Sequence, residues 1–198
     1  KFGDDIVAVL DYSYFSDSSL TINEKEKSIK LLKKITDQVN YQREFQLVFR
    51  KGNEIGANAL ALPSGIIMVT DELIDLINND HELEAVLAHE VAHIIERHGI
   101  RQILQGSALL VLITFITGDV SSVVTLVSSI PIFLTETYYS REFEREADLY
   151  VYKYLTDNKI SLSHYTNILE RISPEEENFN FLASHPTTDN RTKMFKSN

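Results

Sequence analysis

The chain has 198 residues, of which 43% are hydrophobic and 24% charged, and its formal net charge is −10. These values are typical of one globular domain with its own core, so we expect residues 1–198 to form a single domain. The acidic balance argues against nucleic-acid binding, because phosphate contacts require a basic surface. Without cysteine the chain has neither disulfides nor thiolate metal ligands. It begins at Lys1 without a signal-like segment, so we expect a processed protein or a piece of a longer, membrane-anchored one.

The first third of the chain predicts a helix followed by short strands. Residues 1–20 show no clear period. Thr21 and Glu24 then form the pattern of a capping box, and apolar residues recur at helical spacing as far as Val39, so we expect a packing helix with a lysine-rich solvated face. Later residues predict strands at 44–51 and 66–70, a turn at Gly52-Asn53 and a short helix at 71–78.

A longer helix is predicted over residues 80–98, with Gly99 as its stop, and it contains His89-Glu90-Val91-Ala92-His93. Histidines four residues apart lie on one helix face, about 6 Å apart along the axis, so both can reach one metal ion. Glu90 is rotated about 100° from His89, which lets it act on a water without coordinating the metal. This pattern is the signature of zinc peptidases, although five letters alone also arise by chance.

Two uncharged runs follow, at residues 102–118 and 120–135, with Asp119 between them. Each run is shorter than the roughly 20 residues that span a bilayer. We favour a helical hairpin in the core or at a protein interface. Contact with a membrane surface is the alternative, and a pair of spanning helices is least favoured.

The last third predicts helices. We expect them at 140–157, at 161–172, from Pro174 onward and at 191–196, with a loop at 179–190. Together with the strands they predict a mostly helical α+β domain with a small sheet.

A catalytic zinc ion usually takes three protein ligands, and the helix over 140–157 offers the third. Glu144 can be that ligand, and Asp148, one turn later on the same face, can accept a hydrogen bond from the outer nitrogen of a ligating histidine. The alternative is a solvated acidic face paired with Arg141 and Arg145. The histidine-glutamate motif makes the metal ligand the better interpretation.

Four motifs together resemble the HtpX and CAAX-prenyl-endopeptidase family of gluzincin metallopeptidases. They are the strand segment Asn58 to Thr70, in which Leu60 and Ser64 depart from the family's N-A-F-A-L-P-G-G; the zinc helix His89 to His93; Ser140-Arg141-x-x-Glu144-x-x-Ala147-Asp148; and Ser184-His185-Pro186 followed by Arg191. The resemblance covers roughly residues 50–195.

This resemblance implies a zincin-like fold and one Zn²⁺ held by His89, His93 and Glu144. Glu90 would be the general base, and Asp148 would support a ligand. The segment before Thr70 would be an edge strand beside the cleft, where a peptide pairs by adding a strand. We therefore expect substrate contacts from a set of five residues: Asn58, Ala59, Met68, Val69 and Arg191.

His185 keeps three interpretations: an oxyanion stabiliser, a fourth zinc ligand in a resting state, or a loop histidine held by a backbone carbonyl. His98 and His164 are expected to have ordinary surface or packing roles.

The function implied is a zinc metalloendopeptidase acting on protein or peptide substrates, in protein quality control. A bacterial cell-envelope location is expected, with the cytoplasm as alternative and with membrane-surface contact through 102–135. The rival functions are a latent, chaperone-like zinc-binding module and a metal-free structural domain.

Overall fold

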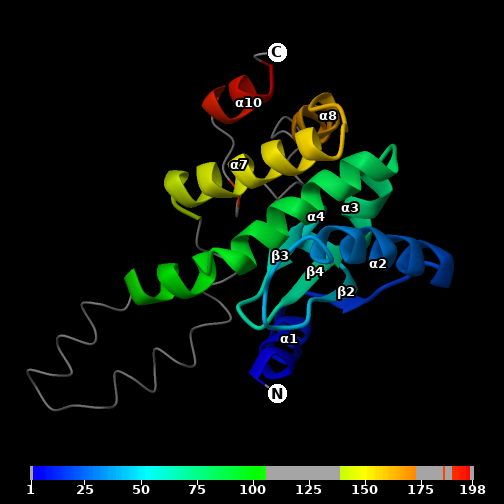
Figure 1. Cartoon of the computed structure of the whole chain (residues 1–198). Helices are drawn as coiled ribbons and strands as arrows, with labels where there is room; N and C mark the ends of the chain where they lie inside the picture. The colour runs from blue at the N-terminus through cyan, green and yellow to red at the C-terminus, as the bar shows by residue number, and fades with distance from the viewer. Residues whose placement is uncertain (1, 106–138, 173–184, 186–188, 197–198) are drawn as a thin grey trace, which may run out of the picture.

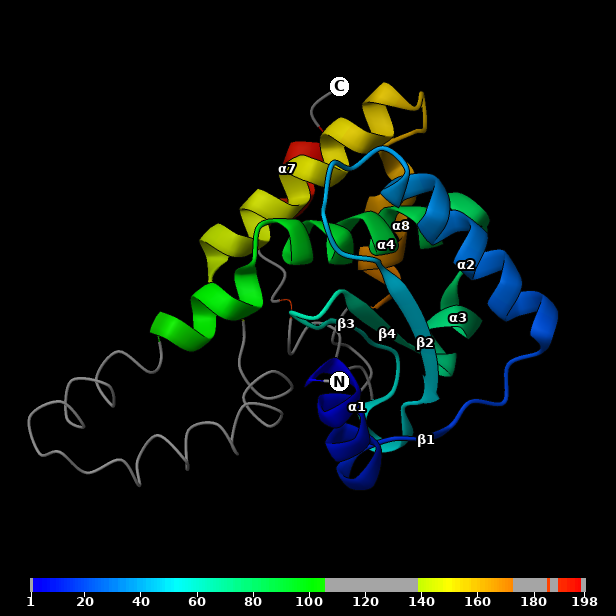
Figure 2. The same cartoon turned by 60° about the horizontal axis from the view of Figure 1, so that its bottom comes forward.

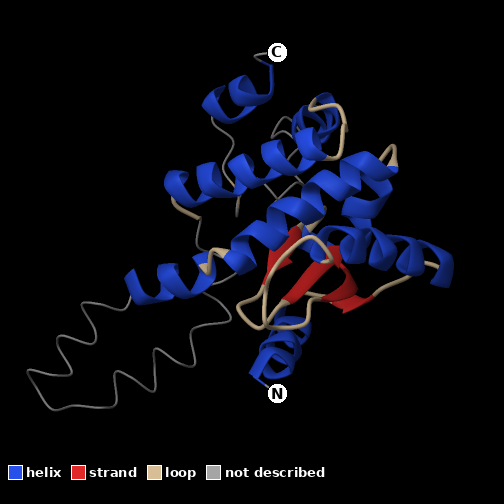
Figure 3. Cartoon of the chain, in the orientation of Figure 1, coloured by secondary structure: helices blue, strands red, loops and turns tan. Residues whose placement is uncertain are grey.

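A computed structural model of the chain describes residues 2–105, 139–172, 185 and 189–196. Helices surround one small sheet, as Figure 3 shows. The expected mostly helical α+β architecture is confirmed.

The sheet has four strands in the order β1-β2-β4-β3. Their bounds are β1 Ser16–Asp17, β2 Gln46–Lys51, β3 Ala59–Ala61 and β4 Ile66–Thr70. β4 pairs in parallel with β2 on one side and antiparallel with β3 on the other. β3 is therefore an edge of the sheet and β4 is not.

The two faces of the sheet carry separate clusters of apolar side chains, because neighbouring residues of a strand point to opposite faces. Helix α1, Phe2–Ser13, covers one face. In Figure 2 it lies on the opposite side of the sheet from α2 and α4. Against α1 pack Leu60, Ile66 and Met68, and the cluster on the other face includes Leu47, Phe49, Ala59, Ala61, Ile67 and Val69.

Helix α2, Ile22–Thr36, begins as predicted with a capping box. Thr21 accepts a hydrogen bond from the backbone of Glu24, and the Glu24 carboxylate accepts from the backbone N–H of Thr21. The predicted turn after β2 is a short 3-10 helix, η1, Asn53–Ile55, and the short helix α3 spans Asp71–Leu76. α1 was not predicted.

The central helix α4, Asp80–Ile95, is shorter than predicted. Asn79 caps its start by accepting hydrogen bonds from the backbone N–H groups of two residues in the first turn. Its end is set by Arg97, whose φ of 57° lies in the left-handed region, and not by Gly99. The chain then resumes a helix over residues 98–105 in a new direction.

Helices α7, Arg141–Asp157, α8, Ser163–Arg171, and α10, Asp189–Lys196, complete the described fold and agree with the predicted segments. In Figure 1, α4 runs between α7 and the sheet. The uncharged region from residue 106 on, the helix expected from 174 and most of the loop at 179–190 lie outside the described residues. No helix among those described is both long and apolar enough to cross a bilayer.

Candidate active site

Four side chains from three separate parts of the chain meet at the packed faces of α4 and α7. His89 and His93 project from α4, Glu144 projects from α7, and His185 comes from the chain before α10. All four are buried, and one ligand atom of each lies within 4.8 Å of all the others. The acidic residues of α7 thus divide. Glu142 is exposed and pairs with Arg145, whereas Glu144 faces the histidines.

The spacing of these atoms fits a single zinc ion. Zinc–nitrogen and zinc–oxygen bonds of about 2.0 Å at tetrahedral angles place neighbouring ligand atoms about 3.3 Å apart. Here the two Nε2 atoms of His89 and His93 are 2.9 Å apart, and Nε2 of His93 lies 3.4 Å from Oε1 of Glu144. Nδ1 of His185 is 3.0 Å from the same Oε1 and 3.3 Å from Nε2 of His89. Nitrogen and carboxylate oxygen are also the donors zinc prefers in a cysteine-free site.

Glu90 lies beside this cluster without belonging to it. It is fully buried, and neither of its carboxylate oxygens has a hydrogen-bond partner among the described residues. Oε1 lies 3.6 Å from Nε2 of His185. Burial raises the pKa of Glu90 above that of an ordinary carboxyl group. A carboxylate in this state can accept a proton from a water molecule, because a base works best with a pKa near the operating pH.

The outer nitrogen of His89 is held by a buried polar network. Nδ1 lies 3.2 Å from Oδ1 of Asp148 and 2.9 Å from the hydroxyl of Tyr165, which itself donates to Asp148. Arg191 completes the network with two hydrogen bonds to Asp148 and an ion pair to Glu144 at 2.7 Å. Such contacts fix the tautomer and orientation of a ligating histidine. Tyr165 was not singled out in the sequence, where nothing marked it.

The outer side of His93 is held differently. The ring of Tyr139 stacks on it, with centroids 4.0 Å apart. Nδ1 of His93 lies 2.9 Å from Nδ1 of His98, which is fully buried. The expectation that His98 has an ordinary surface or packing role is therefore too weak, because its ring nitrogen contacts a residue of the cluster.

The carboxylates around the cluster favour a positive charge inside it. Burial alone would lower the pKa of His89, but the carboxylates of Glu144 and Asp148 outweigh it and raise that pKa to about 9. Burial and the neighbouring charge on His89 hold the pKa of His93 well below its ordinary value. The pKa of Glu144 is also lowered despite burial, because His185 and His89 face it. A metal ion bound to Nε2 of His89 would replace the proton that faces Glu144, whereas Asp148 would keep its contact with Nδ1.

The match to known proteins agrees with this geometry. A model of peptidase family M48 matches residues 24–198. The chain belongs to peptidase family M48. M48 enzymes are zinc metallopeptidases, and the match confirms the resemblance carried by the four motifs.

Two curated proteins are similar to this M48 chain. It is 29% identical over 148 residues to mitochondrial metalloendopeptidase OMA1 of Arabidopsis thaliana, an alignment that covers 72% of this chain and 29% of that protein. It is 29% identical over 145 residues to metalloprotease LoiP of Escherichia coli (strain K12), covering 70% of this chain and 57% of that protein. The chain therefore spans less than two thirds of the length of these relatives.

Three residues expected to touch substrate are placed elsewhere in this M48 domain. Met68 packs on the α1 face of the sheet, away from α4. Val69 is fully buried, and β4 is paired on both sides, so neither residue can accept an added strand. Arg191 is buried against Asp148 and Glu144, so it supports the cluster. These corrections arise because strand order and burial cannot be deduced from a motif.

The other two substrate residues lie at the sheet edge. Asn58 directly precedes β3 and accepts a backbone hydrogen bond from Thr70, and Leu62 donates to Ile66. In an antiparallel pair only every second residue directs its backbone N–H and C=O toward the partner strand. Asn58 and Leu62 do so here, so the backbone N–H and C=O groups of Ala59 and Ala61 point away from β4.

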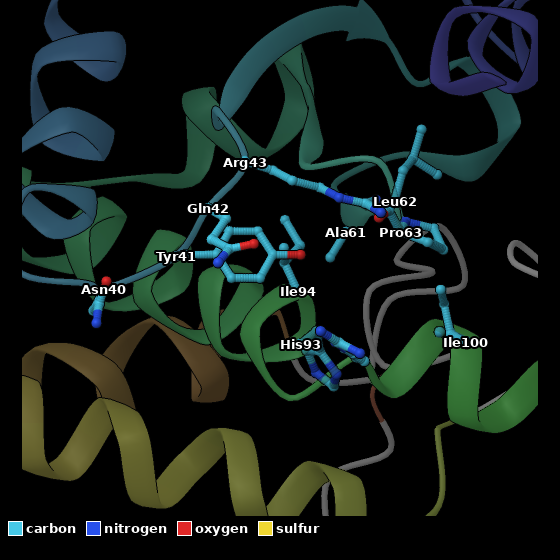
Figure 4. A pocket seen from close by; sticks show the side chains of 12 residues that line it. Asn40, Tyr41, Gln42, Arg43, Ala61, Leu62, Pro63, His93, Ile94 and Ile100 are labelled. Carbon is cyan, nitrogen blue, oxygen red and sulfur yellow. The ribbon is translucent and has the colours of Figure 1, made fainter. Parts of the chain in front are cut away.

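A pocket of about 460 Å³ opens beside the M48 cluster, at the end of β3. Figure 4 shows His93 on one side of it, with Tyr41 and Arg43 opposite and Leu62 and Pro63 beside them. Arg43 donates a hydrogen bond to the carbonyl of Pro63. The lining also includes Ala61, Ile94, Arg97 and Ile100. A ligand in this pocket would contact both the sheet edge and a histidine of the cluster.

Proposed function

We propose that this chain carries the catalytic centre of a zinc metalloendopeptidase that hydrolyses internal peptide bonds of protein substrates. One observation carries the proposal: a buried carboxylate, Glu90, has no hydrogen-bond partner among the described residues and lies beside four side chains able to hold one ion. A purely structural metal site has no use for such a base.

In this mechanism His89, His93 and Glu144 would hold the metal. When bound, zinc would act as a Lewis acid and lower the pKa of its bound water molecule to about 7. Glu90 takes the proton of the attacking water and returns it to the leaving amine. Asp148, Tyr165 and Arg191 keep His89 and Glu144 in their positions. Because these groups are buried, little reorganisation is needed during the reaction.

We assign His185 as a fourth ligand in a resting state. The support is the short distance from its Nδ1 to Glu144 and His89, which puts this atom among the ligand atoms. Substrate binding then requires His185 to leave that position. The alternative role, stabilisation of the oxyanion, would require it to face the scissile carbonyl.

We propose that the substrate pairs with the outer edge of β3 and places one side chain in the pocket beside His93. The outward backbone groups of Ala59 and Ala61 support this arrangement, since an extended peptide can add to the unpaired edge of a sheet. Ala61 also lines the pocket, so edge and pocket are continuous. Such binding recognises the peptide backbone of an extended segment. Extended segments are available in unfolded proteins, so this mode of binding suits a role in quality control.

The experiment that tests the activity is Glu90→Gln. We expect the variant to keep one zinc per chain and to lose nearly all cleavage of an unfolded, dye-labelled casein, because an amide cannot take up the proton. Unchanged cleavage would remove Glu90 from this role. Metal analysis of parent and variant measures the zinc content. One zinc per chain in both would exclude a metal-free structural domain.

A latent zinc-binding module with little proteolysis is the second candidate, and the position of His185 among the ligand atoms favours it. Stoichiometric zinc without any cleavage of unfolded casein, even in His185→Ala, would support this module over the peptidase.

We further propose a cell-envelope location with membrane-surface contact through residues 102–135. Leu104, at the start of this region, and Ile100, just before it, are exposed. Liposome flotation of the full chain tests the contact, and absence of binding at low salt would count against it.

A further inference from the structure

A second hydrogen-bonded chain leads outward from the cluster on the side of His93. Nδ1 of His93 lies 2.9 Å from Nδ1 of His98, and Nε2 of His98 lies 2.9 Å from Oε2 of Glu146. Arg101 donates to that same oxygen at 2.7 Å. His98 is fully buried, whereas the side chains of Glu146 and Arg101 are 26% and 41% exposed. The chain therefore connects a buried ligand to an ion pair at the surface.

The chemistry of the two rings assigns a direction to these hydrogen bonds. If Nε2 of His93 faces the metal, its neutral ring carries a proton on Nδ1, and that N–H must find an acceptor. Nδ1 of His98 is the atom in reach. His98 then carries its own proton on Nε2 and donates it to the Glu146 carboxylate. Each atom has one role, and the order cannot be reversed while His93 ligates through Nε2.

The ring of His98 is also fixed in its plane. Phe143 stacks on it with centroids 4.6 Å apart and planes 11° apart. The guanidinium of Arg101 lies over the same phenyl ring, 4.3 Å from its centroid. Since Phe143 and Glu146 both belong to α7, the helix that supplies Glu144 also orients the partner of His93.

We propose that His98 and Glu146 are positioning residues for zinc, which hold His93 in the orientation and tautomer that ligation requires. His89 is held directly by Asp148, whereas His93 is held through an intervening imidazole. The inference rests on the zinc site proposed above and adds a histidine and a carboxylate that the family motifs did not single out. Contacts of this kind typically contribute 10- to 100-fold to metal affinity.

The test compares zinc affinities of the full chain, measured by competition with a chromophoric chelator at fixed pH. We expect His98→Ala to bind zinc about 10-fold more weakly than the parent. His98→Gln should bind within about threefold of the parent, because its amide offers one acceptor and one donor, as the ring does. Glu146→Leu should weaken binding as His98→Ala does, because the tautomer of His98 is then no longer fixed.

Two further measurements separate positioning from packing. Glu142→Leu removes an exposed carboxylate from the same helix and should leave zinc affinity unchanged. The visible spectrum of the cobalt-substituted protein should change in His98→Ala and return in His98→Gln.

Zinc binding by His98→Ala and Glu146→Leu as tight as by the parent would overturn the inference. So would a His98→Gln variant as weak as His98→Ala, which would show that the ring acts by packing on Phe143. If His98→Ala does not fold, the Gln and Glu146 variants decide the question. A parent that binds no zinc would overturn the zinc site itself, and this inference with it.

Discussion

Arg191 and Asp148, which lie 43 residues apart in the sequence, form a buried pair joined by two hydrogen bonds. Nε of Arg191 donates to Oδ2 at 2.6 Å and Nη2 donates to Oδ1 at 2.8 Å. Burial works against the charge of Arg191, but the acidic groups around it keep its pKa above the ordinary value. The guanidinium is thus a fixed positive charge behind the cluster, and it ties α10 to α7.

We predict that Arg191→Met destabilises the zinc-free protein by about 3–5 kcal/mol, because it removes the guanidinium that pairs with two buried carboxylates, Asp148 and Glu144. Urea unfolding in the presence of a chelator measures this loss. Arg145→Met, on the exposed side of α7, is the matched control and should change stability by less than about 0.5 kcal/mol. A loss in Arg191→Met no greater than the control's would contradict the prediction.

His185→Ala should increase the turnover of unfolded casein without reducing zinc content, because it frees the fourth position of the proposed site. The measurement is kcat together with metal analysis. His164→Ala, which changes a histidine whose ring lies beside that of His81, is the control. If His185 instead stabilises the oxyanion, kcat falls about 100-fold, and the resting-state assignment is wrong.

Ala61→Pro should raise KM about 10-fold with a smaller effect on kcat, because the ring removes an outward N–H that a paired peptide would use. An edge strand tolerates proline at a position whose N–H points away from the neighbouring strand, and Ala61 also borders the pocket. Ala61→Ser keeps the N–H and should behave as the parent. An unchanged KM in a folded Ala61→Pro variant would exclude pairing at this residue.

Stability should fall in acid through Glu84, a buried carboxylate of α4. It accepts hydrogen bonds from Lys34 and Tyr154 and contacts His81. Although burial disfavours its charge, these partners hold its pKa below the ordinary carboxyl value. A lowered pKa means that the folded state binds this proton less readily than the unfolded state. The stabilisation is therefore present at neutral pH and is lost as the pH falls through the folded-state value.

Glu84→Gln should accordingly cost about 2 kcal/mol at pH 7, and the difference from the parent should shrink as the pH falls below the ordinary carboxyl pKa of about 4.5. Urea unfolding of the zinc-free proteins across this range measures it, with Glu142→Gln as the exposed control. A difference that stays constant down to pH 3 would show that Glu84 acts by packing alone.

The cluster residues carried by local motifs could be predicted because their spacing has a direct geometric meaning. His89 and His93 share a helix face at i and i+4, as do Glu144 and Asp148. The sequence could not show that α7 lies against α4. The need of a catalytic zinc for a third ligand and the family resemblance were the two reasons to connect these helices.

His98 was missed for a physical reason. Five residues along a continuous helix turn a side chain about 140° away from His93, to a different face. The left-handed residue Arg97 breaks the helix and brings His98 back toward His93. Non-glycine residues rarely adopt this conformation, so the amino-acid sequence gave no reason to predict a break at Arg97.

The sheet and the N-terminal helix were only partly predictable. Apolar Ile6, Val7 and Leu10 of α1 have helical spacing, but the segment is short and aspartates and serines obscure the period. The pairing of β2 directly with β4, with β3 outside, depends on long-range contacts. For that reason β4 was expected to be the edge strand beside the cleft, whereas the edge of the sheet is β3.

Every residue of α4 from Glu82 to Ile94 is buried, including both histidines of the cluster. This helix has no solvent-facing side from which it could unwind by itself. Its backbone amides should therefore exchange with deuterium only when the whole domain opens. The metal, if it dissociates from the native protein, must leave past moving side chains such as His185, with the helix beneath it still intact.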